Sequence, residues 1–102
     1  APDSSAARHA LGVTSLVAGN YQEAIGALKE AIQLDPDNGS YHLSLAQAYE
    51  NANHIEDSLS EYEAFLELAP DDPRAEKIAR LVDRAKKALD ERRSTGSPKG
   101  DS

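Results

Sequence analysis

One pattern of residues occurs twice in this chain, and the two copies lie 34 positions apart. Each copy has a leucine followed by a small residue, then a turn sequence, then apolar residues three or four positions apart, and finally a proline. A period of this length is typical of a repeat made of two helices joined by a turn. The matching segments are Leu11-Gly12 and Leu45-Ala46, Gly19-Asn20-Tyr21 and Asn53-His54-Ile55, Ala24 and Ser58, Leu28 and Tyr62, Ala31 and Phe65, and Leu34-Asp35-Pro36 and Leu68-Ala69-Pro70.

Each copy also carries the residues that begin, turn and end a pair of helices. The small residue after the leucine lets a neighbouring backbone approach closely. Gly19 and Asn53 occupy the same place in the two turns, and glycine and asparagine tolerate positive φ angles. Pro36 and Pro70 end the second helices, because proline cannot continue a helix and restricts the residue before it. The sequence therefore predicts helices over residues 5–18, 21–34, 39–51 and 55–68, with Ser4 or Ser5 capping the first.

A fifth helix is predicted after the second copy, from Pro73 to about residue 91. Asp71 or Asp72 can cap it, and proline is favoured at a first helical position. The apolar residues of this helix form one stripe, but it lacks the leucine–small signature of the copies. We interpret it as a capping helix, which closes the end of a repeat array and presents a polar outer face.

The two copies in phase resemble the tetratricopeptide repeat family. The resemblance implies an all-α fold, namely a right-handed alpha-alpha superhelix of two antiparallel helix–turn–helix repeats plus the capping helix. Arg8 and His42 stand where the family often has a bulky residue, which leaves fine packing open. We divide the chain into a flexible N-terminus (1–4), repeat 1 (5–38), repeat 2 (39–72), the capping helix (73–93) and a disordered tail (94–102).

Charge is distributed unevenly along the chain. The net charge is −7, made up of −3 over residues 1–38, −8 over residues 39–72 and +4 over residues 73–102. Overall acidity argues against binding to nucleic acid or to anionic membranes. No apolar run approaches the roughly 18 residues of a transmembrane helix, and no signal peptide is visible. We expect a soluble chain of unknown compartment, and its start at Ala1 without a methionine suggests a processed chain or a fragment.

No arrangement of residues in the sequence points to catalysis. His9, His42 and His54 fall in different predicted elements and lack metal-ligand spacing. The segment Asp35–Gly39 resembles a calcium loop, but its glycine comes one place early and Ala46 stands where a bidentate glutamate belongs. The chain has no cysteine, no glycine-rich phosphate loop and no nucleophile motif. The sequence thus predicts a protein that is not an enzyme and binds no metal and no cofactor.

The predicted function is protein–protein interaction. The resemblance implies a concave groove lined mostly by the first helix of each pair, which binds an extended peptide or a partner helix. By helical phase, the groove also receives residues from the fifth helix. The predicted groove residues are His9, Val13, Leu16, Val17, Leu43, Gln47, Glu50, Asn51, Arg74, Lys77, Leu81 and Arg84.

Two hypotheses for the partner remain open at this point. The basic residues of the fifth helix favour a protein or peptide with an acidic segment, held by an adaptor or scaffold. Alternatively, the chain is a structural assembly unit, either part of a longer array or a domain that self-associates, because two repeats are fewer than the three usually needed. Some family members clamp a C-terminal carboxylate, but of the matching positions only Arg74 is basic here, so that mode is not expected.

Overall fold

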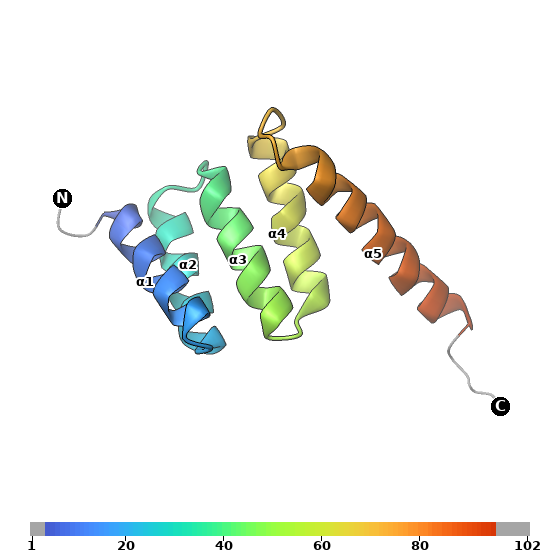
Figure 1. Ribbon diagram of the computed structural model, residues 1–102, viewed down its shortest axis with the longest axis horizontal. Coiled ribbons are helices and arrows are strands. Elements are labelled where there is room, and N and C mark those ends of the chain that lie inside the picture. Colours follow the sequence, from blue (N-terminus) through green and yellow to red (C-terminus); the bar gives the residue numbers. More distant parts are fainter. Residues whose placement is uncertain (1–3, 96–102) are drawn as a thin grey trace.

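The computed structural model describes residues 4–95, and over that range it consists of five α-helices without any strand (Figure 1). This confirms the predicted all-α repeat fold. Each first helix packs most extensively on the helix that follows it, α1 on α2 and α3 on α4, and α2 also packs on α3. The helices are α1 (Ser5–Val17), α2 (Tyr21–Leu34), α3 (Gly39–Asn51), α4 (Ile55–Leu68) and α5 (Ala75–Thr95).

The turns inside the two repeats have the same backbone geometry. Gly19 has a φ of 87° and Asn53 has a φ of 66°, so both adopt the left-handed conformation that was expected of them. The predicted cap of α1 is Ser4, whose hydroxyl accepts a hydrogen bond from the Ala7 backbone N–H at 3.2 Å. The local signals of the sequence are therefore sufficient to set the helix bounds within each repeat.

The core is a thin layer in two parts, as a stack of helix pairs requires. The first cluster joins α2 to α3 and is built on Ala24, Ile25, Leu28, Leu45 and Ala48. The second cluster joins α3, α4 and α5, with a fully buried phenyl ring at its centre. Its buried members are Leu43, Ala46, Leu59, Tyr62, Phe65, Ala75, Ile78 and Val82.

Helix α5 differs from its expected bounds at both ends. It begins at Ala75, and Asp72 accepts a hydrogen bond from the Arg74 backbone N–H in the segment before it. It continues to Thr95, so residues 94 and 95, which we had assigned to a disordered tail, are helical. The rest of that predicted tail and most of the predicted flexible N-terminus lie outside the described residues. In Figure 1 α5 lies beside α4 and extends beyond the body formed by the other four helices.

Two further classes of site are absent from residues 4–95. No helix there is long and apolar enough to cross a membrane. That range also contains no cluster of three or more histidine or carboxylate side chains that is arranged to hold a metal ion. What the described surface does offer is exposed faces of helices, and these are the candidate sites.

Candidate interaction surfaces

The first helices of the two repeats are joined by side-chain contacts. His9 Nε2 lies 2.8 Å from Ser44 Oγ, and its ring lies 4.8 Å from the ring of Tyr41. The Tyr41 hydroxyl in turn lies 3.0 Å from Ser5 Oγ. Burial lowers the pKa of His9, since the charged imidazolium loses solvation there. His9 therefore bridges α1 and α3, in addition to lying on the surface that we predicted as a groove.

Most of the other predicted groove residues are exposed, but one is not. Leu43 keeps only 4% of its surface accessible and belongs to the core cluster with Phe65, Ala75 and Ile78. Our prediction that Leu43 faces a partner is therefore wrong, because Leu43 lies in the core cluster that α3 shares with α4 and the start of α5. The exposed or half-buried members of the set are Val13, Leu16, Val17, Gln47, Glu50, Asn51, Arg74, Lys77, Leu81 and Arg84.

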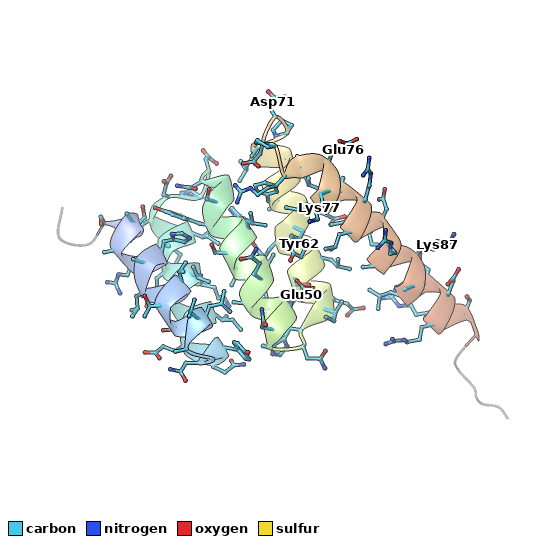
Figure 2. All side chains as sticks on the ribbon, viewed as in Figure 1. Glu50, Tyr62, Asp71, Glu76, Lys77 and Lys87 are labelled. Carbon is cyan, nitrogen blue, oxygen red and sulfur yellow. The ribbon has the colours of Figure 1, made fainter. Side chains whose placement is uncertain are left out.

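Two polar residues near the end of α3 already have partners within the chain. Glu50 accepts a hydrogen bond of 2.6 Å from the Tyr62 hydroxyl, a pair that Figure 2 labels between α3 and α4. Burial, followed by the hydrogen bond to this carboxylate, raises the pKa of Tyr62. Asn51 donates a hydrogen bond of 2.8 Å to the Gln47 carbonyl oxygen. These contacts hold Glu50 and Asn51 in place rather than leaving them free for a ligand.

Arg74, which we predicted as part of the groove, is held by its own loop. Its guanidinium donates two hydrogen bonds of 2.9 Å to the Asp72 carboxylate and lies 5.6 Å from the centre of the Phe65 ring. The hydrogen bonds from Arg74 lower the pKa of Asp72 to about 2. The charge of Arg74 is thus compensated locally, and the residue connects the start of α5 to the core.

The remaining basic residues of α5 fall into two groups. Lys86 and Arg93 make ion pairs to carboxylates of α4, and Arg80 pairs with Glu76 one turn earlier on the same helix. Lys77, Arg84, Lys87 and Arg92 make no ion pair or side-chain hydrogen bond within the part of the chain that the structure describes. Figure 2 labels Lys77 and Lys87 on α5.

Two of the unpaired cations of α5 share a face of the helix with an exposed apolar residue. Lys77, Leu81 and Arg84 follow one another at intervals of four and three, which places them on one face. All three are exposed, and Leu81 keeps 37% of its surface accessible. We call Lys77, Leu81 and Arg84 the α5 stripe.

The repeat architecture matches that of a known family. A sequence profile of the tetratricopeptide repeat matches residues 15–82, which is well over half of the chain. This chain belongs to the tetratricopeptide repeat family. A comparison with curated proteins found no match. Tetratricopeptide repeats generally mediate protein–protein interactions or act as scaffolds, and they are typically not enzymes.

Carboxylate clamping of the kind used by some tetratricopeptide repeat proteins has little support here. The matching positions in this chain are His9, Val13, Ser44, Arg74 and Ile78. Ile78 is buried in the core, His9 and Ser44 contact each other, and Arg74 is paired with a carboxylate of its own loop. The side chains at four of these five positions are therefore engaged in contacts within the chain.

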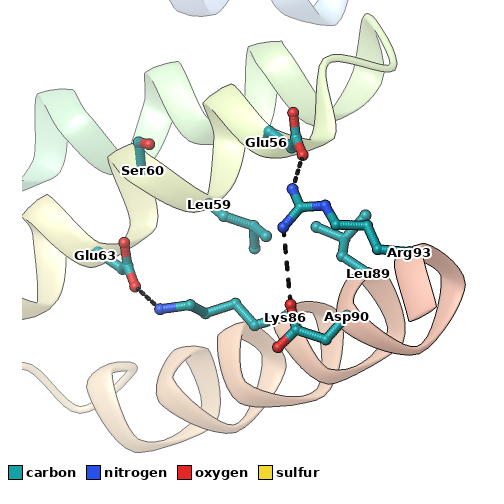
Figure 3. A pocket seen from close by; sticks show the side chains of 8 residues that line it. All are labelled: Glu56, Leu59, Ser60, Glu63, Lys86, Leu89, Asp90 and Arg93. Atoms are coloured by element: carbon teal, nitrogen blue, oxygen red, sulfur yellow. Dashed lines mark hydrogen bonds and ion pairs between the residues drawn. The ribbon is translucent and has the colours of Figure 1, made fainter.

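A cleft between α4 and α5 was not predicted. It has a volume of about 350 Å³, and the side chains of Leu59 and Leu89 lie along it (Figure 3). One ion pair of 2.6 Å, between Lys86 and Glu63, crosses it, and a second of 2.6 Å joins Arg93 to Glu56. The paired residues are 23 and 37 positions apart in the tetratricopeptide repeat chain, so no local pattern reveals them. The only sequence signal is the excess of acid in the second repeat and of base in α5.

Proposed function

We propose that this tetratricopeptide repeat protein binds an extended peptide or a helix of a partner protein along the side formed by α1, α3 and α5. The observation that carries the proposal is the α5 stripe. Lys77 and Arg84 are exposed cations without a carboxylate partner in the described range, and the exposed apolar residue Leu81 lies between them on the same face, whereas Arg80, Lys86 and Arg93 are paired with carboxylates. Exposed cations that no carboxylate of the described range compensates are suited to pair with an acidic partner.

The partner in this proposal has an acidic segment next to an apolar anchor. Acidic side chains pair with Lys77 and Arg84, and the apolar residue packs against Leu81. On α1, Val13 and Val17 are exposed apolar residues, and in this proposal they offer a second anchor point. Because Leu43 is buried, these residues replace the anchor near α3 that the sequence suggested.

In the test, isotope-labelled protein is titrated with a synthetic peptide of repeating Glu-Glu-Leu. Nuclear magnetic resonance measures the changes in the backbone amide chemical shifts of the protein. The shifts are expected on α5 around Leu81 and on the exposed side of α1. Binding is expected to weaken as salt is added, because both charges are exposed and therefore screened. A peptide of repeating Lys-Lys-Leu serves as the comparison and is expected to produce no shifts on α5.

Charge reversal locates the contact. Replacing Lys77 and Arg84 together by glutamate is expected to weaken binding by about tenfold or more, since each lost contact is worth roughly 1 kcal/mol at the surface. The single variant Lys77→Glu is compared with the control variant Lys29→Glu. Lys29 is also exposed, but it lies on α2, away from the proposed binding side, and the change in charge is the same. Equal binding by Lys77→Glu and Lys29→Glu would rule out the stripe as the site.

Molar mass across a range of protein concentrations separates binding from self-assembly. The basic face of α5 already contributes two ion pairs to the acidic α4 within one chain, which leaves less charge for contact between copies. We therefore expect a concentration-independent monomer. If the double variant instead changed the degree of self-association at low salt, the assembly hypothesis would replace the binding hypothesis.

A further inference from the structure

Helix α5 carries the same three residue types, in the same order, on two of its faces. On the face toward α4, Lys86, Leu89 and Arg93 follow one another at intervals of three and four. The α5 stripe also consists of a lysine, a leucine and an arginine, at intervals of four and three. Each set spans seven positions, which is two turns of helix and about 10.5 Å along the helix axis.

The first of these two faces is occupied by α4. Lys86 pairs with Glu63 at 2.6 Å. Arg93, two turns later on α5, pairs with Glu56 at the same distance (Figure 3). Residue numbers therefore rise along α5 where they fall along α4, so the two helices are antiparallel. The two glutamates are seven positions apart, as the two cations are, and each cation has one carboxylate opposite it.

An apolar contact lies between these two ion pairs. Leu59 of α4 is buried, and Leu89 of α5 packs against the cluster that contains it. The four charged side chains, by contrast, are 47–68% exposed. Because exposed ion pairs contribute little to affinity, the leucines supply the burial, whereas the charges select the partner and its direction. This face of α5 thus recognises an acidic helix with a leucine between two glutamates.

The α5 stripe presents the same residue types to solvent. Its leucine is 37% exposed, and its two cations have no ion pair within residues 4–95. A helix with two glutamates seven positions apart matches the distance between those cations. An extended chain matches it less well, because three successive side chains on one side of a strand span about 13 Å. The α5 stripe is therefore complementary to a helix of the kind that α4 provides on the other face.

We propose that the partner segment bound by the α5 stripe is an amphipathic helix that runs antiparallel to α5. In the contact between α4 and α5, an interval of three on one helix lies opposite an interval of four on the other. The matching partner pattern is consequently Glu-x-x-x-Leu-x-x-Glu. Its first glutamate pairs with Arg84, its leucine packs against Leu81, and its last glutamate pairs with Lys77. This inference rests on the function proposed above and specifies the conformation and direction of the partner.

The test uses the full chain and peptides of defined sequence. The probe is an alanine-rich peptide that carries this pattern on one side and a staple on the opposite side, because an unstapled helix of this length is only marginally stable. One control has the same composition and staple, but its last glutamate is moved by two positions and so lies on another side of the helix. The second control is unstapled and contains two prolines, which prevent helix formation.

Nuclear magnetic resonance of the isotope-labelled chain measures binding through the backbone amide shifts. Changes are expected at Lys77, Leu81 and Arg84 when the probe is added. The probe is expected to bind at least about tenfold more tightly than either control, because its charges are on one side and its helix is already formed.

An exchange of charges tests the direction of the bound helix. Arg84→Glu is expected to weaken probe binding by about tenfold, since it replaces an attraction by a repulsion. A probe whose first glutamate is replaced by lysine is expected to restore binding to this variant, whereas a lysine in place of the last glutamate is not. Arg92→Glu is the matched control, because Arg92 is an exposed arginine of α5 that lies two turns beyond the stripe. Circular dichroism of both variants checks that they fold.

The remaining outcomes separate this inference from the function on which it rests. If the proline-containing peptide bound the stripe as tightly as the probe, the surface would still bind acidic peptides, but the helical partner would be refuted. Equal binding by the peptide with the displaced glutamate would refute the pattern. Restoration by the other lysine peptide would refute the antiparallel direction. If no acidic peptide shifted the stripe, the proposed function would fall as well.

The position of the shifts gives one more way to overturn the inference. Shifts at Lys86 and Leu89 in place of the stripe would mean that the probe displaces α4 from the other face of α5. A molar mass that rises with protein concentration and falls on Arg84→Glu would mean that a second copy occupies the stripe.

Discussion

Gly12 and Gly26 both lie inside helices of the first repeat, yet they are expected to respond to the same substitution with opposite signs. A Cβ atom added at Gly12 would lie 2.5 Å from Leu28 Cγ and 2.7 Å from Leu28 Cδ2. Leu28 is completely buried, so it has no free space into which to move. A Cβ atom added at Gly26 would meet nothing within 4 Å. The two positions therefore isolate packing from helix propensity.

The magnitudes follow from these contacts. Replacing glycine by alanine inside a helix stabilises it by about 1 kcal/mol, and this gain applies to both positions. Gly26→Ala is expected to show that gain unopposed. At Gly12 the same gain is offset by overpacking, which costs roughly 1–3 kcal/mol in a well-packed core. Gly12→Ala is therefore expected to be less stable than Gly26→Ala by about 1–3 kcal/mol.

Urea denaturation followed by far-ultraviolet circular dichroism measures the free energy of unfolding of both variants and of the unaltered chain. Agreement between the two m-values is needed before the free energies are compared. The reasoning is refuted if Gly12→Ala and Gly26→Ala differ by less than about 0.5 kcal/mol, the usual effect of an indifferent surface change. Such a result would mean that α1 and α2 do not approach closely at Gly12.

Three further predictions concern the core, the end of the chain and pH. Phe65→Ala should destabilise the fold by about 3–5 kcal/mol, since this ring is completely buried, and urea denaturation measures the loss. Truncation after Asp72 removes α5 and uncovers the apolar face of α4, so light scattering should detect aggregation, whereas truncation after Thr95 should leave the monomer intact. Because burial lowers the pKa of His9 from its ordinary value of 6.5, its contribution to stability is complete above that pH and is lost as the pH falls through the folded pKa. His9→Gln should consequently lose less stability than the unaltered chain between about pH 7.5 and about pH 5, and an equal loss would contradict this.

The helices of the two repeats could be predicted from the sequence because their signals are local. The prolines, the turn residues at positions 19 and 53 and the apolar spacing act on the few residues next to them. The resemblance to the tetratricopeptide repeat family rested on the same signals and is now confirmed. The end of α5 was less well predicted, because no proline or glycine marks it before residue 96.

The candidate surfaces could be predicted only in part, because helical phase does not say which neighbour covers a face. Leu43 has the phase of a groove residue but is buried in the core shared with α4 and α5, and Arg74 pairs with Asp72 of its own loop. The ion pairs between α4 and α5 join residues far apart in the chain, so charge composition indicated them only as an imbalance.

Leu11 and Leu45 show most directly where the two kinds of information separate. Both stand before a small residue at the same place in the repeat, and the sequence alone determined that both lie in a first-type helix with the same phase. Only the tertiary structure decided that Leu45 is buried and that Leu11 is half exposed. The physical reason is that burial depends on the element packed against a residue: α2 packs in one cluster with Leu45, whereas no helix among residues 4–95 covers Leu11 in the same way.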